Sequence, residues 1–327
     1  MTNANPGQSA SWPAGPWPEI PFPSWGETCE TLHMWLQVVG KIRLTYSPWV
    51  NHQWHSTLYV TSRGLTTLPI PHGPRAFQVD FDFLDHVLRI STPDGEVRQL
   101  DLKPRSVADF HGSLLAELDW MGLPVTIHGS PNEVPEPIPF AEDERNHSYD
   151  PEAVTRFFQA LSRTERVFQD FRSRFVGKTS PVHFFWGAMD LAVTRFSGRP
   201  APPHPGGIPH LPDRVTREAY SHEVISAGFW PGGASYPTPI FYSYAYPEPE
   251  GFADASIRPE AARWDSDLSE FVLPYDAVRE SETPEADLMA FLESTYQAAA
   301  DRAGWDREAL EWPSGRPPRL KGPFHGE

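Results

Sequence analysis

The sequence lacks the features that mark several protein classes. It has one cysteine, Cys29, in 327 residues, so no disulfide can form within the chain. No apolar run approaches the ~18 residues that a membrane-spanning helix needs. The start of the chain also lacks the charged and apolar regions of a secretory signal peptide. We therefore expect a soluble, cytoplasmic protein that does not enter a membrane.

Positive charge and nucleotide-binding motifs are scarce as well. Lys and Arg number 27 against 43 Asp and Glu, which gives a net charge of −16 without a basic cluster. Because phosphate neutralisation needs grouped Lys and Arg, this composition argues against nucleic acid as a partner. The patterns GxGxxG, GxxxxGK[ST], GxSxG and HExxH are absent too. No motif identifies a reaction or a cofactor, and the oligomeric state stays open.

Aromatic residues and proline are abundant. There are 12 Trp, 20 Phe and 10 Tyr, and the 37 prolines make up about 11% of the chain against an average of ~5%. The 39% hydrophobic fraction is enough for a core and excludes an intrinsically disordered chain. Proline and tryptophan are mixed without a period over residues 1–26, which predicts an extended arm, and residues 132–150 are typical of an acidic, proline-rich linker.

The hydrophobic periods predict two units of helix and strand. In residues 27–131 a helix over 27–40 is followed by strand-like residues 54–61, an antiparallel meander over 76–102 and a helix over 104–122. In residues 151–305 the predicted order is a helix up to Gly177, strands over 182–196, 220–229, 240–246 and 268–275, and a helix over 284–303, with a tail over 306–327. The fold class is therefore predicted as α+β.

The two halves share an order of residue types. In each half Gly-Lys is followed by Ser-Pro, His, Trp, Val-Thr and Arg, which matches His52 with His183 and Arg63 with Arg195. The spacings differ, so the match requires insertions, and residues 197–216 form a long loop in the second half alone. We expect an internal duplication, with two similar helix, antiparallel meander and helix units packed with pseudo-twofold symmetry.

Several strings of the sequence are distinctive, among them LHMWLQVVGK, LYVTSRGLTT, PVHFFWGAMDLAVTRFSGR and SAGFWPGG. On these strings the chain resembles a widespread bacterial domain-of-unknown-function family over roughly Thr31 to Gly304. The resemblance implies relatives of similar length built from one such unit. It implies no activity, substrate, cofactor or site residue.

Histidines and cationic side chains are the first candidates for chemistry. His52 and His55 in NHQWH are weak candidates for metal ligands, because on a strand they point to opposite faces. The alternative is that both are hydrogen-bonded in an aromatic-rich core. Lys178 and Arg195, with Arg63, are candidates for binding an anionic group. The alternative here is that Lys178 complements a helix dipole and the arginines pair with surface acids.

A second set combines titratable and aromatic side chains in the second half. It consists of catalytic candidates His183, His222 and Glu223, and ligand-binding candidates Trp186, Asp190 and Trp230. Apolar walls with a few converging polar groups are typical of a small-molecule pocket, and histidine beside carboxylates can act as a general base. A well-packed sheet with satisfied polar groups has the same composition. Cys29 with His33 at i+4 is a weaker candidate for a nucleophile.

These observations support one functional hypothesis and one alternative. The first is an enzyme acting on a small polar or anionic metabolite by histidine acid/base chemistry. The alternative is a noncatalytic ligand-binding or protein-interaction module. A pocket that contains several of the polar groups favours the enzyme, and flat exposed tryptophans favour the interaction module.

Overall fold

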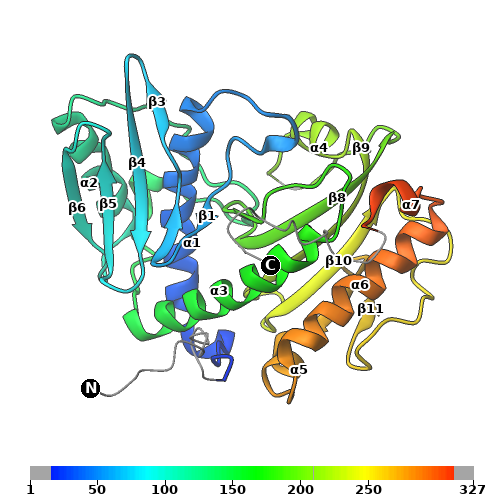
Figure 1. Ribbon diagram of the computed structural model, residues 1–327. Helices are drawn as coiled ribbons and strands as arrows, with labels where there is room; N and C mark the ends of the chain where they lie inside the picture. The colour runs from blue at the N-terminus through cyan, green and yellow to red at the C-terminus, as the bar shows by residue number, and fades with distance from the viewer. Residues whose placement is uncertain (1–15, 209, 313–327) are drawn as a thin grey trace, which may run out of the picture.

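Two antiparallel sheets lie side by side in this protein, with the helix α1 standing between them (Figure 1). The computed structural model describes residues 16–208 and 210–312. The combination of helices and antiparallel sheets confirms the α+β class. None of the helices in these ranges is both long and apolar enough to cross a bilayer.

The first sheet is a meander in which β3 pairs additionally with β4, and its strand order is β1-β2-β4-β5-β6. Phe77, Val79 and Phe81 alternate with half-buried polar residues, as the sequence predicted for a strand with one buried face. The elements of this half are α1 (Phe22–Tyr46), η1 (Asn51–Gln53), β1 (Tyr59–Val60), β2 (Gly64–Thr66), β3 (Ile70–His72), β4 (Arg75–Asp82), β5 (Val87–Ser91), β6 (Val97–Asp101) and α2 (Val107–Trp120).

The second sheet has the order β11-β12-β10-β9-β8-β7. Its first helix begins after Asp150, whose carboxylate accepts from the backbone N–H groups of Glu152 and Ala153, as the predicted N-cap requires. The elements are η2 (Phe140–Glu142) in the predicted linker, α3 (Pro151–Ser173), β7 (His183–Phe185), β8 (Asp190–Pro200), α4 (Asp213–Ala219), β9 (His222–Trp230), β10 (Ile240–Tyr246), β11 (Arg263–Asp265), β12 (Glu270–Pro274), α5 (Tyr275–Arg279), α6 (Pro284–Arg302) and α7 (Arg307–Leu310).

Several sequence predictions of element bounds were wrong; for example, the helix predicted up to Gly177 ends at Ser173, and the loop predicted over 197–216 holds the end of β8 and the start of α4. The helix α1 begins at Phe22 rather than near residue 27, and it continues through Gly40 to Tyr46. Gly40 does not end it, because this glycine makes room for a ring: a Cβ there would stand 2.3 Å from the Trp186 indole. Residues 54–61 hold only the short strand β1, and the single strand predicted over 182–196 is two strands joined by a turn at residues 186–189.

The start of the described chain is packed rather than peripheral. Trp17 is 2% exposed and lies against the rings of Phe241 and Tyr275. The Tyr275 hydroxyl donates to the Pro18 carbonyl at 2.8 Å. The part of the predicted arm that holds Trp12 lies outside the described residues, so the arm is observed only over residues 16–21.

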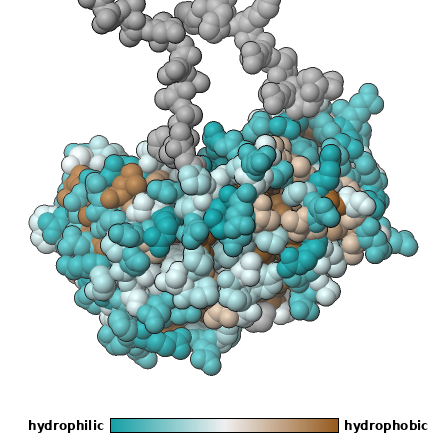
Figure 2. All heavy atoms as spheres, turned by 90° about the horizontal axis from the view of Figure 1, so that it is seen from below, coloured by the Kyte–Doolittle hydropathy of each residue, from teal (hydrophilic) through white to brown (hydrophobic). Residues whose placement is uncertain are grey.

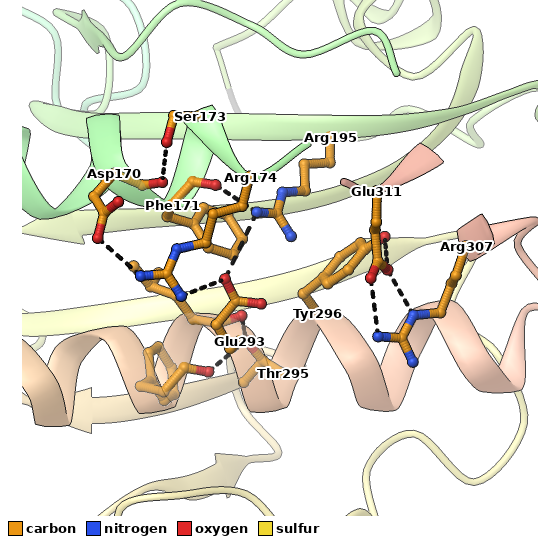
Figure 3. A network of polar contacts seen from close by, with 12 residues as sticks. Asp170, Phe171, Ser173, Arg174, Arg195, Glu293, Thr295, Tyr296, Arg307 and Glu311 are labelled. Atoms are coloured by element: carbon orange, nitrogen blue, oxygen red, sulfur yellow. Dashed lines mark hydrogen bonds and ion pairs between the residues drawn. The ribbon is translucent and has the colours of Figure 1, made fainter. Parts of the chain in front are cut away.

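The helices α3 and α6 cover one face of the second sheet, the face turned to the viewer in Figure 1. Along β8, Arg195 points to these helices and reaches Phe171 of α3 and Tyr296 of α6. Figure 3 shows the polar network there, in which Arg195 lies near Glu293 and the Tyr296 hydroxyl donates to Glu311 at 2.8 Å. The alternate residues of β8, beginning with Asp190, point to the far face.

The two sheets are joined through one pair of backbone hydrogen bonds. Leu58 and Phe184 exchange both of their N–H to carbonyl bonds, at 2.9 and 2.8 Å. The residue pairs that the sequence matched do not occupy equivalent places in the two halves. Arg63 lies in the turn between β1 and β2 whereas Arg195 lies within β8, and His52 is in η1 whereas His183 is in β7.

Candidate functional site

Carboxylates and tyrosines gather on the far face of the second sheet, beneath the loops that follow α2 and β8. Asp190 is buried, at 8% exposed, Glu133 is exposed, and the other members are half-buried. We call this set the acid–tyrosine cluster, and its members are Glu133, Asp190, Tyr220, Tyr242, Tyr244 and Glu270.

The strand β10 positions two of the tyrosines. Tyr242 and Tyr244 alternate with buried residues, so both rings lie on the far face, stacked with centroids 6.1 Å apart. The Tyr242 hydroxyl donates to Asp190, and the hydroxyls of Tyr244 and Tyr220 are 2.8 Å apart. Gly228 on β9 leaves room for Tyr242, since a Cβ there would stand 2.2 Å from its hydroxyl oxygen. The sheet therefore fixes Tyr242 against Asp190.

Glu133 reaches the cluster from the loop after α2. Its backbone has φ 58°, a left-handed conformation that is uncommon outside glycine. Its carboxylate lies against the backbone of Gly187, where a Cβ would stand 2.1 Å from Oε1. Within the described residues, no hydrogen bond or ion pair reaches the carboxylates of Glu133 and Glu270. Both are thus free to meet a ligand.

Burial raises the pKa values of all three carboxyl groups, and the Asp190 charge adds to the effect on the other two. Burial raises the pKa of Asp190 to about 6. Burial, with the Asp190 charge, raises the pKa of Glu133 to about 7. Burial, with Asp190 and then Asp265, raises the pKa of Glu270 to about 8. These groups exchange protons near neutral pH, where an ordinary carboxyl group is fully ionised.

A second group of polar side chains lies farther along the same face. The Nζ atom of Lys178 is 2.7 Å from Nε2 of His52, and it lies over the rings of Trp54 and Phe196. The Nδ1 atom of His52 is 3.0 Å from the Ala219 carbonyl. A donor at Nδ1 and an acceptor at Nε2 describe a neutral imidazole, and burial lowers the pKa of His52 accordingly.

The structure distributes the other predicted site residues over several places. His222 contacts the His52 ring, whereas Glu223, its neighbour on β9, forms an ion pair with Arg199. Trp186 is buried with its indole N–H on the Ser56 carbonyl, and Trp230 contacts Tyr236.

The two arginines do not join these residues. Arg195 lies on the opposite face of the sheet from Asp190. The two residues are an odd number of positions apart on β8, and side chains alternate between the faces along a strand. Arg63 forms ion pairs with Asp82 and Asp85. The anion pocket predicted from Lys178, Arg195 and Arg63 is therefore not assembled; Arg63 pairs with acids, whereas Arg195 is buried against aromatic rings.

His183 is 1% exposed and lies among the rings of Trp54, Tyr59 and Phe185. Neither ring nitrogen has a hydrogen-bond partner among the described residues. Burial, with the nearby Arg172 charge, lowers the pKa of His183 to about 3. The imidazole is therefore neutral in the folded protein and sits apart from the acid–tyrosine cluster.

His183 is expected to make folding stability depend on pH. Below pH 6.5 the unfolded chain gains a proton on this imidazole that the folded chain does not accept, so stability falls as the pH falls from 6.5 toward 3. At pH 5 the loss is about 2 kcal/mol, since one pKa unit corresponds to ~1.4 kcal/mol. Urea unfolding at pH 7 and at pH 5 measures how much free energy of unfolding each protein loses between the two pH values. His183→Phe should lose about 2 kcal/mol less than the wild type. An identical loss in both proteins would contradict this role.

Two surface hollows lie outside the acid–tyrosine cluster. One of about 420 Å³ is lined by residues that include His128, Asn132 and His210, and it borders the loop that carries Glu133. The other, of about 240 Å³, includes Glu223, Arg302 and Trp305. The face seen in Figure 2 is mostly hydrophilic, with hydrophobic residues in small separate areas.

Neither a metal site nor a reactive thiol is found at the positions considered from the sequence. In the described parts of the chain no three His, Cys, Asp or Glu side chains are grouped closely enough to hold a metal ion. His55 is occupied with the Val50 backbone. Cys29 is buried with its sulfur 3.6 Å from that of Met189, and burial raises the pKa of its thiol. The thiol is therefore protonated at neutral pH.

Sequence reasoning identified Asp190 but missed the rest of the cluster. The string FYSYAY places tyrosines at alternate positions, which was a readable signal for a tyrosine-lined sheet face. Glu133 lies in a stretch interpreted as a linker, and Glu270 is a single acid at the start of a strand. Neither has a local pattern that distinguishes it from an exposed residue.

The comparisons with known proteins identify a family but no function. A family model described as "Family of unknown function (DUF5996)" matches residues 17–312. The chain belongs to this family, which confirms the resemblance stated from the sequence. Neither the search of curated proteins nor the search of solved structures finds a match.

Proposed function

We propose that this protein binds a small polar ligand carrying an amine or other cation at the acid–tyrosine cluster. One observation carries the proposal: three carboxyl groups with raised pKa values share a tyrosine-lined face, and no described Lys or Arg side chain forms an ion pair with them. A ligand cation would supply the missing positive charge. An anionic ligand would add repulsion at the same place.

The tyrosine rings support the same ligand class. A cation over an aromatic face is attracted by the ring quadrupole, with about 0.5–2 kcal/mol per contact. The stacked rings of Tyr242 and Tyr244 and the nearby ring of Tyr220 lie beside the carboxylates. Carboxylates with aromatic rings bind an ammonium group more strongly than either does alone.

Glu133 is proposed as the acid/base group. A general base or acid works best when its pKa lies near the working pH, and the pKa of Glu133 is about 7. Asp190 is held by Tyr242 and is better suited to fixing the ligand. The noncatalytic alternative has the same site without turnover, so product formation separates the enzyme from the binding protein.

Tetramethylammonium is a suitable first probe, because it carries its charge at every pH. We expect saturable shifts of the cluster tyrosine signals by NMR, with a dissociation constant on the order of 1–10 mM. Asp190→Asn should weaken binding about tenfold, since one charge contact is removed. Asp101→Asn, at an exposed position of the first sheet, is the matched control and should leave binding unchanged.

The pH dependence of this binding follows from the carboxyl groups. A bound cation favours their ionised forms, so affinity should rise from pH 6 to pH 8 and binding should release protons. Calorimetry in two buffers of different ionisation enthalpy measures that release. Equal binding of acetate and tetramethylammonium, or no effect of Asp190→Asn, would overturn the proposal.

A second candidate function keeps the histidine chemistry of the original hypothesis. Lys178, His52 and His222 form a contiguous group on the same face, and Lys178 could bind an anionic part of a metabolite while His222 exchanges a proton. Titration with inorganic phosphate, compared between wild type and Lys178→Met, tests it. Unchanged phosphate binding in that variant would exclude the second candidate.

We also propose, as a further reading of the fold, that the chain arose by internal duplication. Both sheets have a run of strands in chain order, preceded and followed by helices, and the two runs meet at Leu58 and Phe184. The cytoplasmic location likewise stays a prediction.

A further inference from the structure

We infer that Gln37 is a positioning residue that sets the carboxylate of Glu133 in the acid–tyrosine cluster. This inference rests on the proposed function of that cluster. Gln37 lies on α1, is 0% exposed and is not itself a member of the cluster. It acts through the two backbone segments that meet at Glu133.

The first contact is with the loop residue that precedes Glu133. The Oε1 atom of Gln37 accepts from the Asn132 backbone N–H at 2.8 Å, and its Nε2 donates to the Asn132 carbonyl at 2.7 Å. Both backbone polar groups of Asn132 are thus held by one amide side chain. Lys41, one turn further along α1, donates to the Asn132 side chain.

The second contact is with the turn opposite. Nε2 of Gln37 is 3.4 Å from the Gly187 carbonyl, and His33 holds the same carbonyl at 2.8 Å. Gly187 is the residue against which the Glu133 carboxylate lies. Because His33, Gln37 and Lys41 are spaced by four residues, they form one stripe on α1 that faces both segments.

This arrangement explains how Glu133 is held without a hydrogen bond to its own carboxylate. Gln37 fixes the backbone of Asn132, the residue before Glu133, and Glu133 itself has a left-handed backbone conformation. The Glu133 carboxylate then lies against Gly187, which restricts its position. A buried, doubly bonded amide on a rigid helix resists displacement of such a loop. The carboxylate is therefore presented to a ligand while its own oxygen atoms stay unoccupied by described protein groups.

The test is Gln37→Leu, which introduces an apolar side chain of similar size and removes the contacts of the amide with Asn132 and Gly187. Titration of the Glu133 carboxyl carbon by NMR should give a pKa at least one unit below that of the wild type, since a released carboxylate moves toward water and away from Asp190. Tetramethylammonium affinity should fall at least fivefold. Glu270, whose pKa is raised by burial, Asp190 and Asp265, should keep its titration.

Two further variants make the result decisive. Thr295→Val removes a buried hydrogen bond on α6, on the opposite face of the sheet, and should leave the Glu133 titration unchanged. Gln37→Met also removes the amide without adding a charge and serves if the leucine variant does not fold; its Glu133 pKa should fall as in Gln37→Leu. A lowered melting temperature with an unchanged Glu133 titration would overturn the inference. The titration needs no ligand, so failure of tetramethylammonium to bind wild type would count against the proposed function alone.

Discussion

Replacing Arg195 with alanine is expected to lower the free energy of unfolding by about 3–5 kcal/mol, the range measured when one partner of a buried ion pair is removed. The guanidinium is 1% exposed and lies 3.5 Å from the Phe171 ring centroid and 4.3 Å from that of Tyr296 (Figure 3). Its Nη2 donates to the Phe171 carbonyl at 2.5 Å and lies 3.9 Å from Glu293. Alanine removes the hydrogen bond, the packing against two rings and the charge together.

Two variants separate these contributions. Arg195→Met retains most of the volume between α3 and α6, so it should lose less stability than alanine. Arg63→Ala removes the residue that the sequence matched with Arg195, but the Arg63 side chain is 47% exposed, so its removal should cost less stability than that of Arg195. Urea unfolding measures all three. Equal losses for Arg195→Ala and Arg63→Ala would show that burial of Arg195 does not matter.

Replacing Trp17 with alanine is expected to cost a comparable 3–5 kcal/mol, as for other buried aromatic residues truncated to alanine. Trp17 fills the space against Phe241 of β10 and Tyr275 of α5, so its removal leaves a cavity beside these two rings. The hydrogen bond from the Tyr275 hydroxyl to the Pro18 carbonyl would also be weakened, because Trp17 holds the neighbouring residue in place. Thermal unfolding followed by circular dichroism measures the change.

Trp49→Ala is the matched control for that experiment. Trp49 is 64% exposed, and exposed substitutions of this kind change stability by no more than about 0.5 kcal/mol. If both variants have the melting temperature of the wild type, residues 16–21 are not part of the hydrophobic core and belong to a separate arm, as predicted from the sequence. If Trp17→Ala alone is destabilised, this segment is part of the second sheet's core.

Much of the fold was predictable because short-range patterns decide it. The alternation of Phe77, Val79 and Phe81 gave the strand β4, and the turn after Pro93 gave the next hairpin. Asp150 followed by Pro151 marked the start of α3. In each case the energy that selects the structure comes from residues within a few positions of one another.

The candidate site was predictable only in part, because the phase of a strand decides which face a side chain occupies. Residues 182–196 were interpreted as one strand, but the turn at residues 186–189 separates β7 from β8 and brings Asp190 opposite Phe185. A shift of one residue exchanges the two faces of a strand. Arg195 therefore lies under α3 and α6, away from the residues with which the sequence had grouped it.

The sequence by itself determined the α+β class, the family, the antiparallel meander and most helix starts, since these follow from local periodicity, capping and turn residues. Only the tertiary structure decided that Glu133, Asp190 and Glu270 share one face with the tyrosines of β10. These carboxylates come from a loop and two strands far apart along the chain, and their raised pKa values arise from burial, with the Asp190 charge adding to the effect on Glu133 and Glu270. Neither the shared face nor the raised pKa values can be predicted from the residues next to any one of these carboxylates in the sequence.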